Sequence, residues 1–166
     1  MNVQFINPFI ESILEVLATM ALLEAHSAAP YLKDNTRPLG VISGFIKMEG
    51  ELVRGSIAIS FERETLLQIC HNMLGEPVTE LNDDARDLVG EITNMLTGGA
   101  KRRLWDMGYN FELATPEIHS EDVYRVEHIV QGKVVVIPFT TQAGRFFIEV
   151  CFDDARVKAE VGRFTL

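Results

Sequence analysis

One line of polar residues, on a helix predicted from its apolar periodicity, carries the side chains of this sequence that could take part in chemistry. The line consists of Asp87, Glu91, Asn94 and Gly98. Spacings of four, three and four residues place all of them on one face of a helix at about 100° per residue. The two carboxylates could act as paired acid and base in hydrolysis, enter a pocket of a partner protein, or belong to an ordinary solvated surface.

Two features of this line argue against an ordinary solvated surface. Asp87 and Glu91 are like charges one turn apart, which destabilises a helix slightly, and the line contains no cation before Arg102. Gly90 and Gly98 lie inside the helix, where each costs about 1 kcal/mol relative to alanine. These glycines leave the side chains between them clear of neighbours, which suits side chains that enter a partner's pocket.

The helix that carries this line is predicted to begin at Asn82 or Asp83 and to run to about Met107. Its other side gathers the apolar residues that would pack on the rest of the domain, namely Ala85, Leu88, Val89, Ile92, Met95 and Leu96. An N-terminal helix is predicted to open at Asn7-Pro8, because asparagine can cap a helix and proline is tolerated at its first position. That helix is expected to run to about residue 25.

The remaining segments predict a further helix and an antiparallel sheet. Strands are expected over residues 39–48, 52–61, 123–130, 133–141 and 145–152, with a short extended piece over 109–113 and a helix over 62–74 that ends at Gly75. The order of helix, hairpin, two helices and strand meander predicts an α+β fold. We expect both long helices to pack on a largely antiparallel sheet of about five to six strands.

Length and composition predict one domain. The chain has 166 residues and 47% hydrophobic content, which is enough for one substantial core and too little for two. We therefore expect a single domain over residues 1–166, with its core at about residues 4–152. The C-terminal extension, residues 153–166, is expected to be a short helix or a mobile end.

Charge and cysteine usage exclude several classes of function. A net charge of −9 disfavours nucleic acid and anionic lipid as partners. The longest apolar stretch, residues 13–23, is interrupted by Glu15 and is too short to span a bilayer. Cys70 and Cys151 have neither metal-ligand spacing nor a histidine cluster nearby, so buried thiols are expected and a metal site is not. The expected compartment is the cytoplasm.

The segment around Glu91 resembles the signature of the CheC/CheX/FliY family of chemotaxis phosphatases. That signature is an acidic residue, then Glu-x-x-Asn four residues on, then a distant proline, and Asp87, Glu91, Asn94 and Pro116 occupy these places. The resemblance covers roughly residues 4–152 and implies a CheC-like domain.

The N-terminal helix places the chain on the CheX branch of this family. CheC-like members carry a second Glu-x-x-Asn motif there. In this chain Glu11 is followed three residues later by Leu14, and Glu15 by Ala18, so neither completes the motif. A single motif is the CheX arrangement, and CheX-like proteins tend to be homodimers that pair through sheet edges.

The resemblance implies a phosphatase that hydrolyses the aspartyl phosphate of a CheY-type receiver domain. By resemblance, Asn94 orients the attacking water and Glu91 pairs with the receiver's active-site lysine. A carboxamide suits the first task because it offers one water both a donor and an acceptor. The chain needs no cofactor of its own, since Mg²⁺ comes with the receiver. Further partner contacts are expected from Asp87, Gly98, Lys101 and Arg102.

Each further contact has a structural alternative. Asp87 could be an ordinary surface residue, and Gly98 could instead serve helix–sheet packing. Lys101 and Arg102 lie near a helix C-terminus, where basic side chains also favour the macrodipole.

Three other residues and the histidines are expected to have structural roles. Trp105 and Phe111 are predicted to lie in the core, with binding anchors as the alternative, and Pro116 is predicted to shape the loop beside the long helix, with direct partner contact as the alternative. The four histidines have no ligand spacing and are predicted to be structural or solvent-exposed.

Two alternative functions remain open at this point. A non-catalytic adaptor would keep the receiver-docking line without turnover, although it would have no need of the Asn94 amide. A small-molecule hydrolase would use Asp87 and Glu91 as paired carboxylates, yet an exposed helix face supplies no pocket that excludes water. The sequence does not name the receiver or the signalling output.

Overall fold

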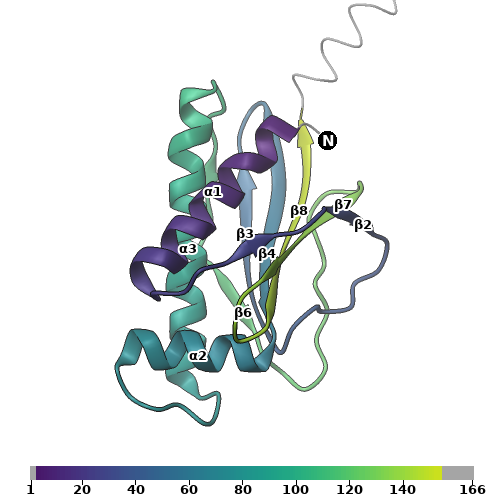
Figure 1. Cartoon of the computed structure of the whole chain (residues 1–166). Coiled ribbons are helices and arrows are strands. Elements are labelled where there is room, and N and C mark those ends of the chain that lie inside the picture. The colour runs from purple at the N-terminus through teal and green to yellow at the C-terminus, as the bar shows by residue number, and fades with distance from the viewer. Residues whose placement is uncertain (1–2, 155–166) are drawn as a thin grey trace, which may run out of the picture.

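A computed structural model describes residues 3–154, and these form an α+β fold in which three helices pack on one antiparallel sheet (Figure 1). The helices are α1 (Val3–Met20), α2 (Arg63–Leu74) and α3 (Asp83–Asp106). The strands are β1 (His26–Ser27), β2 (Tyr31–Lys33), β3 (Ile42–Glu49), β4 (Val53–Phe61), β5 (Glu112–Leu113), β6 (Glu117–His119), β7 (Val134–Thr140) and β8 (Arg145–Asp154). The predicted fold class is confirmed.

The sheet is built around four long strands in the order β7-β8-β4-β3. β3 and β4 form the predicted hairpin, in register from Ile42 opposite Phe61 to Glu49 opposite Arg54. Short strands complete the edges, since β1 and β2 pair with β7 while β5 and β6 pair with β3. These short pieces bring the described sheet to eight strands, which is more than the sequence predicts. No helix within residues 3–154 is long and apolar enough to cross a membrane.

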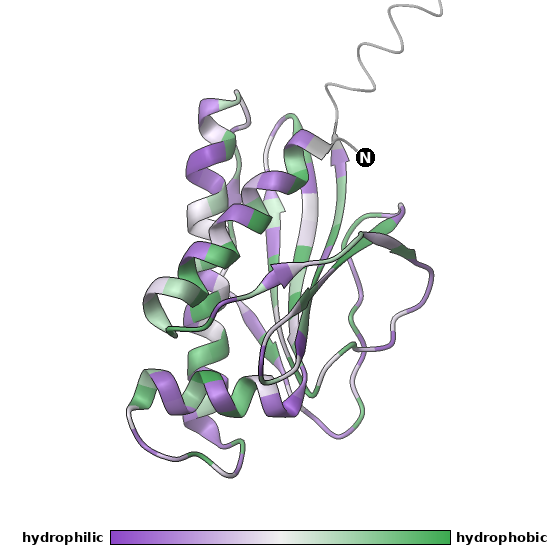
Figure 2. Cartoon of the chain, viewed as in Figure 1, coloured by the Kyte–Doolittle hydropathy of each residue, from purple (hydrophilic) through white to green (hydrophobic). Residues whose placement is uncertain are grey.

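The two long helices lie side by side on one face of the sheet (Figure 1). Alternate residues of the central strands, such as Ile57 and Ile148, join the apolar sides of α1 and α3 in one core. Ser12 of α1 donates a hydrogen bond to the Leu96 carbonyl at 2.7 Å, and a Cβ at Gly99 would collide with the Ser12 hydroxyl. This close approach turns one side of α3 toward α1 and the sheet and leaves its other side exposed. Figure 2 shows hydrophilic residues in the upper turns of α3, toward its C-terminal end.

Helix α1 differs from the prediction at both ends. It begins at Val3, so Pro8 lies inside it, and it ends at Met20. Phe5, which is fully buried, packs on Phe9 and other rings, so the burial gained before the proline outweighs the one helical hydrogen bond that proline cannot donate. At the other end Leu22 has φ 49°, a left-handed conformation that stops the helix.

The segment over residues 123–130 is not a strand, so that prediction is wrong. It crosses the sheet face opposite α1 and α3, where Val126 packs on Phe45 and Ala58. Its polar backbone groups bond to neighbours other than a strand ladder: the Val126 N–H donates to the Thr36 carbonyl and the Ile129 N–H to a side-chain oxygen. Strands β5 and β6 already pair with the edge of β3. The segment therefore has no free edge of β3 to pair with, and it packs on the face of the sheet instead.

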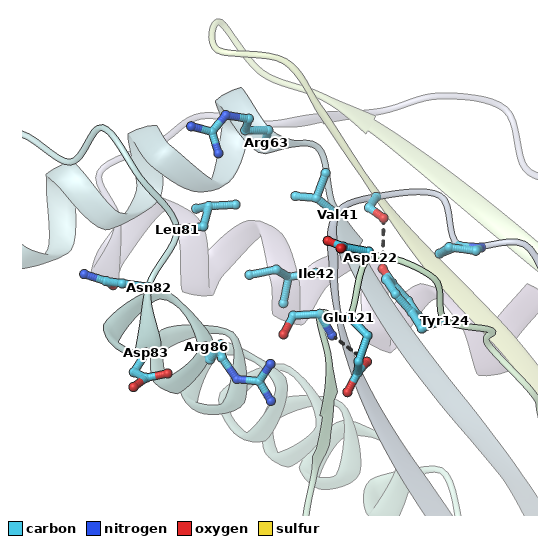
Figure 3. A pocket seen from close by; sticks show the side chains of 13 residues that line it. Val41, Ile42, Arg63, Leu81, Asn82, Asp83, Arg86, Glu121, Asp122 and Tyr124 are labelled. Carbon is cyan, nitrogen blue, oxygen red and sulfur yellow. Dashed lines mark hydrogen bonds between the residues drawn. The ribbon is translucent and has the colours of Figure 1, made fainter.

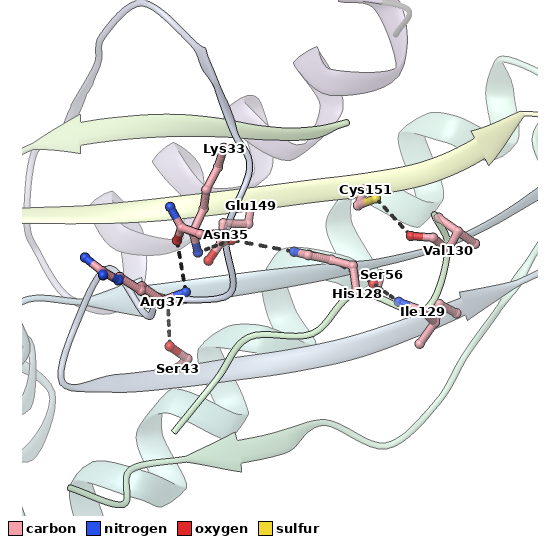
Figure 4. Close-up of polar contacts among 11 residues, drawn as sticks. Lys33, Asn35, Arg37, Ser43, Ser56, His128, Ile129, Val130, Glu149 and Cys151 are labelled. Carbon is pink, nitrogen blue, oxygen red and sulfur yellow. Dashed lines mark hydrogen bonds and ion pairs between the residues drawn. The ribbon is translucent and has the colours of Figure 1, made fainter. Parts of the chain in front are cut away.

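A buried polar cluster lies beneath this segment (Figure 4). Lys33 Nζ is 2.8 Å from Glu149 Oε1, and His128 Nε2 is 3.6 Å from the same oxygen, with all three side chains at most 4% exposed. Ser56 Oγ lies 2.8 Å from His128 Nδ1. The cluster thereby ties β2 and the crossing segment to β4 and β8. The predicted structural role of the histidines holds for His128.

The two cysteines are free and buried, as the sequence predicts. Burial raises the pKa of both the Cys70 and the Cys151 thiol, so both stay protonated near neutral pH. β8 ends at Asp154, so residues 153 and 154 extend the last strand. The rest of the predicted C-terminal extension lies outside the described residues.

Candidate functional site

Helix α3 carries the candidate site, and local sequence fixes where it begins. The Asn82 side chain accepts a hydrogen bond from the Ala85 N–H at 3.2 Å, which caps the first turn. Asp83 and Asp84 follow in that turn, where the helix dipole favours negative charge. The whole helix, from Asp83 to Asp106, has 24 residues and a length of about 36 Å. The predicted start and end are confirmed.

The exposed line along α3 is called the ridge here, and its core is Asp87, Glu91 and Asn94. All three are exposed, while Leu88, Ile92 and their apolar neighbours on the opposite side are buried. Within residues 3–154 none of the three side chains has a hydrogen bond or ion pair with the chain. Two carboxylates and an amide that stabilise nothing in their own fold are free to engage a partner.

Gly98 continues the ridge and leaves a notch in it. A Cβ built at this residue has no heavy atom within 4 Å, so no neighbouring element requires a glycine there for packing. By contrast, a Cβ at Gly90 would lie 3.7 Å from Ile118 of β6. The helix–sheet packing alternative for Gly98 therefore has no support in the structure, and the close approach of a partner at Gly98 stays a prediction.

The three consecutive cations after the notch differ in their partners. Lys101 forms an ion pair with Glu112 at 3.6 Å, and Arg103 is 2.6 Å from Glu15 on α1. Arg102 is exposed and has no ion pair within the described part of the chain. Lys101 and Arg102 are the two cations expected to contact a partner, and of these two only Arg102 has no ion pair among the described residues.

The structure contradicts the predicted core position of Trp105 and confirms the predicted core position of Phe111. Trp105 is 58% exposed and Phe111 only 1%. Trp105 follows Asp87 by 18 residues, which is five turns of an α-helix, so it stands on the same side as the ridge. The same 100° arithmetic that located Glu91 and Asn94 could have placed Trp105 on the exposed side.

Pro116 lies between β5 and β6, the two short strands that pair with β3 beside α3. Ile118, two residues later, is the residue nearest the Gly90 position on α3. This placement agrees with the expectation that Pro116 shapes the loop next to the helix.

A pocket of about 520 Å³ lies at the N-terminal end of α3, and its lining excludes Asp87, Glu91 and Asn94 (Figure 3). Its charged lining residues have both signs: Arg63 and Arg86 are basic, and Asp83, Glu121 and Asp122 are acidic (Figure 3). The pocket therefore gives the two ridge carboxylates no water-excluding site, and a small-molecule hydrolase built on Asp87 and Glu91 finds no support. Residues 3–154 also contain no group of three or more His, Cys, Asp or Glu side chains that could hold a metal ion.

An antiparallel sheet covered by two long helices, one of which exposes a Glu-x-x-Asn ridge, defines a CheC-like domain. The sequence model of the family described as chemotaxis phosphatase CheX matches residues 42–140. The chain belongs to this family.

Solved structures agree with that assignment. A CheC-like superfamily protein from Shewanella sp. PV-4 is 44% identical, with a TM-score of 0.86 over 92% of this chain and 99% of that one. The chemotaxis protein CheX from Vibrio vulnificus is also 44% identical, with a TM-score of 0.84 over 91% of this chain and 100% of that one. A chain of the CheX–CheY–BeF3–Mg²⁺ complex from Borrelia burgdorferi shares the fold at 20% identity, with a TM-score of 0.74 over 92% of this chain and 100% of that one. No curated protein sequence matches significantly.

Proposed function

We propose that this chain hydrolyses the aspartyl phosphate of a CheY-type receiver domain and so ends a cytoplasmic chemotaxis or two-component signal. The observation that carries the proposal is the ridge: Asp87, Glu91 and Asn94 fill the family's motif and have no partner within the described chain. The Borrelia burgdorferi complex, which joins a CheX to CheY with BeF3 and Mg²⁺, supports a receiver as the partner class.

Asn94 is assigned to orient the attacking water. Hydrolysis forms a bond from the water oxygen to phosphorus, breaks the bond between phosphorus and the aspartyl oxygen, and releases inorganic phosphate and the free carboxylate. Such a transfer depends on positioning and charge stabilisation. The amide can accept a hydrogen bond from the water and donate one to it, and it stays uncharged beside the phosphoryl group. Mg²⁺ is supplied by the receiver.

Glu91 is assigned to docking, because a carboxylate would repel the phosphoryl group. It lies one turn before Asn94 on the same exposed face, about 4.5 Å along the helix axis. A charge-assisted hydrogen bond from Glu91 to the receiver's lysine would fix the register that brings Asn94 over the phosphorus. Asp87, one turn earlier, extends the same acidic contact.

The test is phosphate loss from a phosphorylated CheY-type receiver with catalytic amounts of this protein. We expect several turnovers per molecule from the wild type. Glu91→Lys should lower kcat/KM by about 10²-fold, since losing one partner of a buried charge pair costs about 2–5 kcal/mol and the new cation also repels the lysine. Glu127→Lys is the matched control, because Glu127 is exposed on the segment that crosses the opposite sheet face. A receiver that binds the wild type without faster phosphate loss would show that the chain is an adaptor.

Substitutions at Gly98 should raise the stability of the protein and weaken its interaction with the receiver. Gly98→Ala and Gly98→Leu both replace glycine in a helix with a good helix former, and the Cβ of either has no heavy atom of another element within 4 Å, so each should raise the free energy of unfolding by about 1 kcal/mol. Both should raise KM for the receiver, and leucine more than alanine because its larger side chain fills the notch. Thermal unfolding and the receiver concentration dependence are measured on the same samples. Equal KM values for all three proteins would contradict a close approach at Gly98.

The expected homodimer is part of the proposal. The short strands β1 and β2 along β7, and β5 and β6 along β3, are the outermost strands of the described sheet, and each pairs on one side only. The backbone groups on their other side can pair with a second copy. The ridge on α3 lies on a helical face, so edge pairing and receiver docking use different surfaces.

A further inference from the structure

We infer that Trp105 and Arg102 form a second contact for the receiver, in which the indole covers an apolar surface and the guanidinium pairs with an acidic residue beside it. This inference rests on the proposed function and extends its docking surface to the C-terminal end of α3. The remaining part of the ridge, from Asp87 to Asn94, would hold the reacting end of the receiver.

The exposure of Trp105 is the first observation. It is the only tryptophan of the chain, and it is 58% exposed although the neighbouring Leu104 is fully buried. A single exposed apolar residue needs no explanation by itself. Trp105, however, follows Asn94 by 11 residues, which is three turns plus about 20°, so it stands in line with the amide assigned to orient the water.

The free charge of Arg102 is the second observation. Lys101 and Arg103 on either side have ion pairs within the fold, with Glu112 and with Glu11 and Glu15 respectively. Arg102 is exposed and has no ion pair among residues 3–154. It lies one turn before Trp105, so a guanidinium without an ion pair and an exposed indole are neighbours on the helix surface. Trp and Arg are the residues most enriched among those that dominate binding energy in protein interfaces.

The length and polarity of the ridge argue for one partner that touches both ends. From Asp87 to Trp105 the helix rises about 27 Å, and a compact domain of about 120 residues has a diameter on the order of 30 Å. The ridge is acidic at Asp87 and Glu91, open at Gly98 and cationic at Arg102. A receiver that places its lysine on Glu91 and an acidic residue on Arg102 can dock in one direction only, because the reverse orientation opposes like charges.

The experiment compares Trp105→Ala and Arg102→Glu with the wild type in receiver dephosphorylation at varied receiver concentration. We expect each variant to raise KM by about tenfold or more and to leave kcat close to the wild-type value, because the contact is remote from the phosphoryl group. Leu74→Ala is the matched control, since Leu74 is also an exposed apolar side chain but lies at the end of α2. Trp105→Phe should recover most of the affinity.

Fluorescence gives a readout that does not depend on turnover. Trp105 is the only tryptophan in the chain, so its emission should shift to shorter wavelength when a tryptophan-free receiver carrying beryllofluoride covers it. An unchanged KM for Trp105→Ala together with unshifted emission would overturn the inference while wild-type turnover kept the proposed function intact. A change in the dimer equilibrium of Trp105→Ala without a change in KM would assign the contact to a second copy of this chain, and would also overturn it. Absence of wild-type turnover would instead reject the proposed function itself.

Discussion

Asn94→Ala should slow receiver dephosphorylation by roughly 10²-fold or more while receiver binding stays close to the wild-type value. The substitution removes the group proposed to orient the water and disturbs little else. Asn94 is exposed on α3 and its side chain has no hydrogen bond within residues 3–154, so its truncation removes no side-chain hydrogen bond of the fold. Alanine is also a better helix former than asparagine. The expected loss therefore belongs to the chemical step, and single-turnover phosphate loss at saturating protein measures it directly.

Two further substitutions at this residue identify which property of the amide matters. Asn94→Asp keeps the size but places a carboxylate beside the phosphoryl group, so it should be as slow as alanine. Asn94→Gln keeps the amide but moves it outward by one methylene, and a misplacement of about 1 Å can cost about 10²-fold. A rate for Asn94→Ala within a few-fold of the wild type would mean that the receiver's own groups position the water, with this chain supplying only the docking surface.

The position of the ridge could be predicted from the sequence because rotation along a helix is fixed by geometry. Spacing alone predicts an exposed face for Glu91 and Asn94, and the structure has them there. The general preference of tryptophan predicts a core position for Trp105, although its spacing from Asn94 puts it on the exposed side, where the structure has it. Helical register is thus the stronger guide where the two disagree.

The crossing segment shows what alternation cannot predict. Tyr124, Val126 and His128 point toward the sheet while Arg125 and Glu127 are exposed, which is the pattern of a half-buried strand. Alternation reports only that one side of an extended chain is covered. Whether its backbone joins a ladder depends on which strand edges are free, and that is decided by β5 and β6 elsewhere in the chain.

The buried polar cluster depends on contacts that no local pattern contains. Lys33 and Glu149 are 116 residues apart in the sequence, and each lies in a segment that could equally have exposed its charge. Strand alternation in β8 turns Ile148 and Val150 toward the helices, so Glu149 between them faces the other side, where Lys33 and His128 meet it. The sequence could therefore not predict this ion pair.

Lys33→Met should lower the free energy of unfolding by about 3–5 kcal/mol, because it leaves the Glu149 carboxylate buried without its cation. The Lys33 and Glu149 side chains are 3% and 1% exposed, so water cannot replace the lost partner. Glu149 Oε2 already has no hydrogen bond within the described residues, and His128 Nε2 lies 3.6 Å from the other oxygen. Urea unfolding measures the change. Lys133→Met is the matched control, since Lys133 is exposed and the same substitution there should stay within about 0.5 kcal/mol.

The double variant Lys33→Met/Glu149→Leu tests whether the ion pair makes a net contribution to stability or only offsets the cost of burying its two charges. Replacing both charges with apolar side chains removes the desolvation cost together with the attraction, so its stability should return close to the wild-type value or exceed it. The specific activity of the folded protein should be unchanged in both variants, because the cluster lies on the sheet face opposite the ridge. If the double variant were as unstable as Lys33→Met, the pair itself would hold β2 and the crossing segment in place.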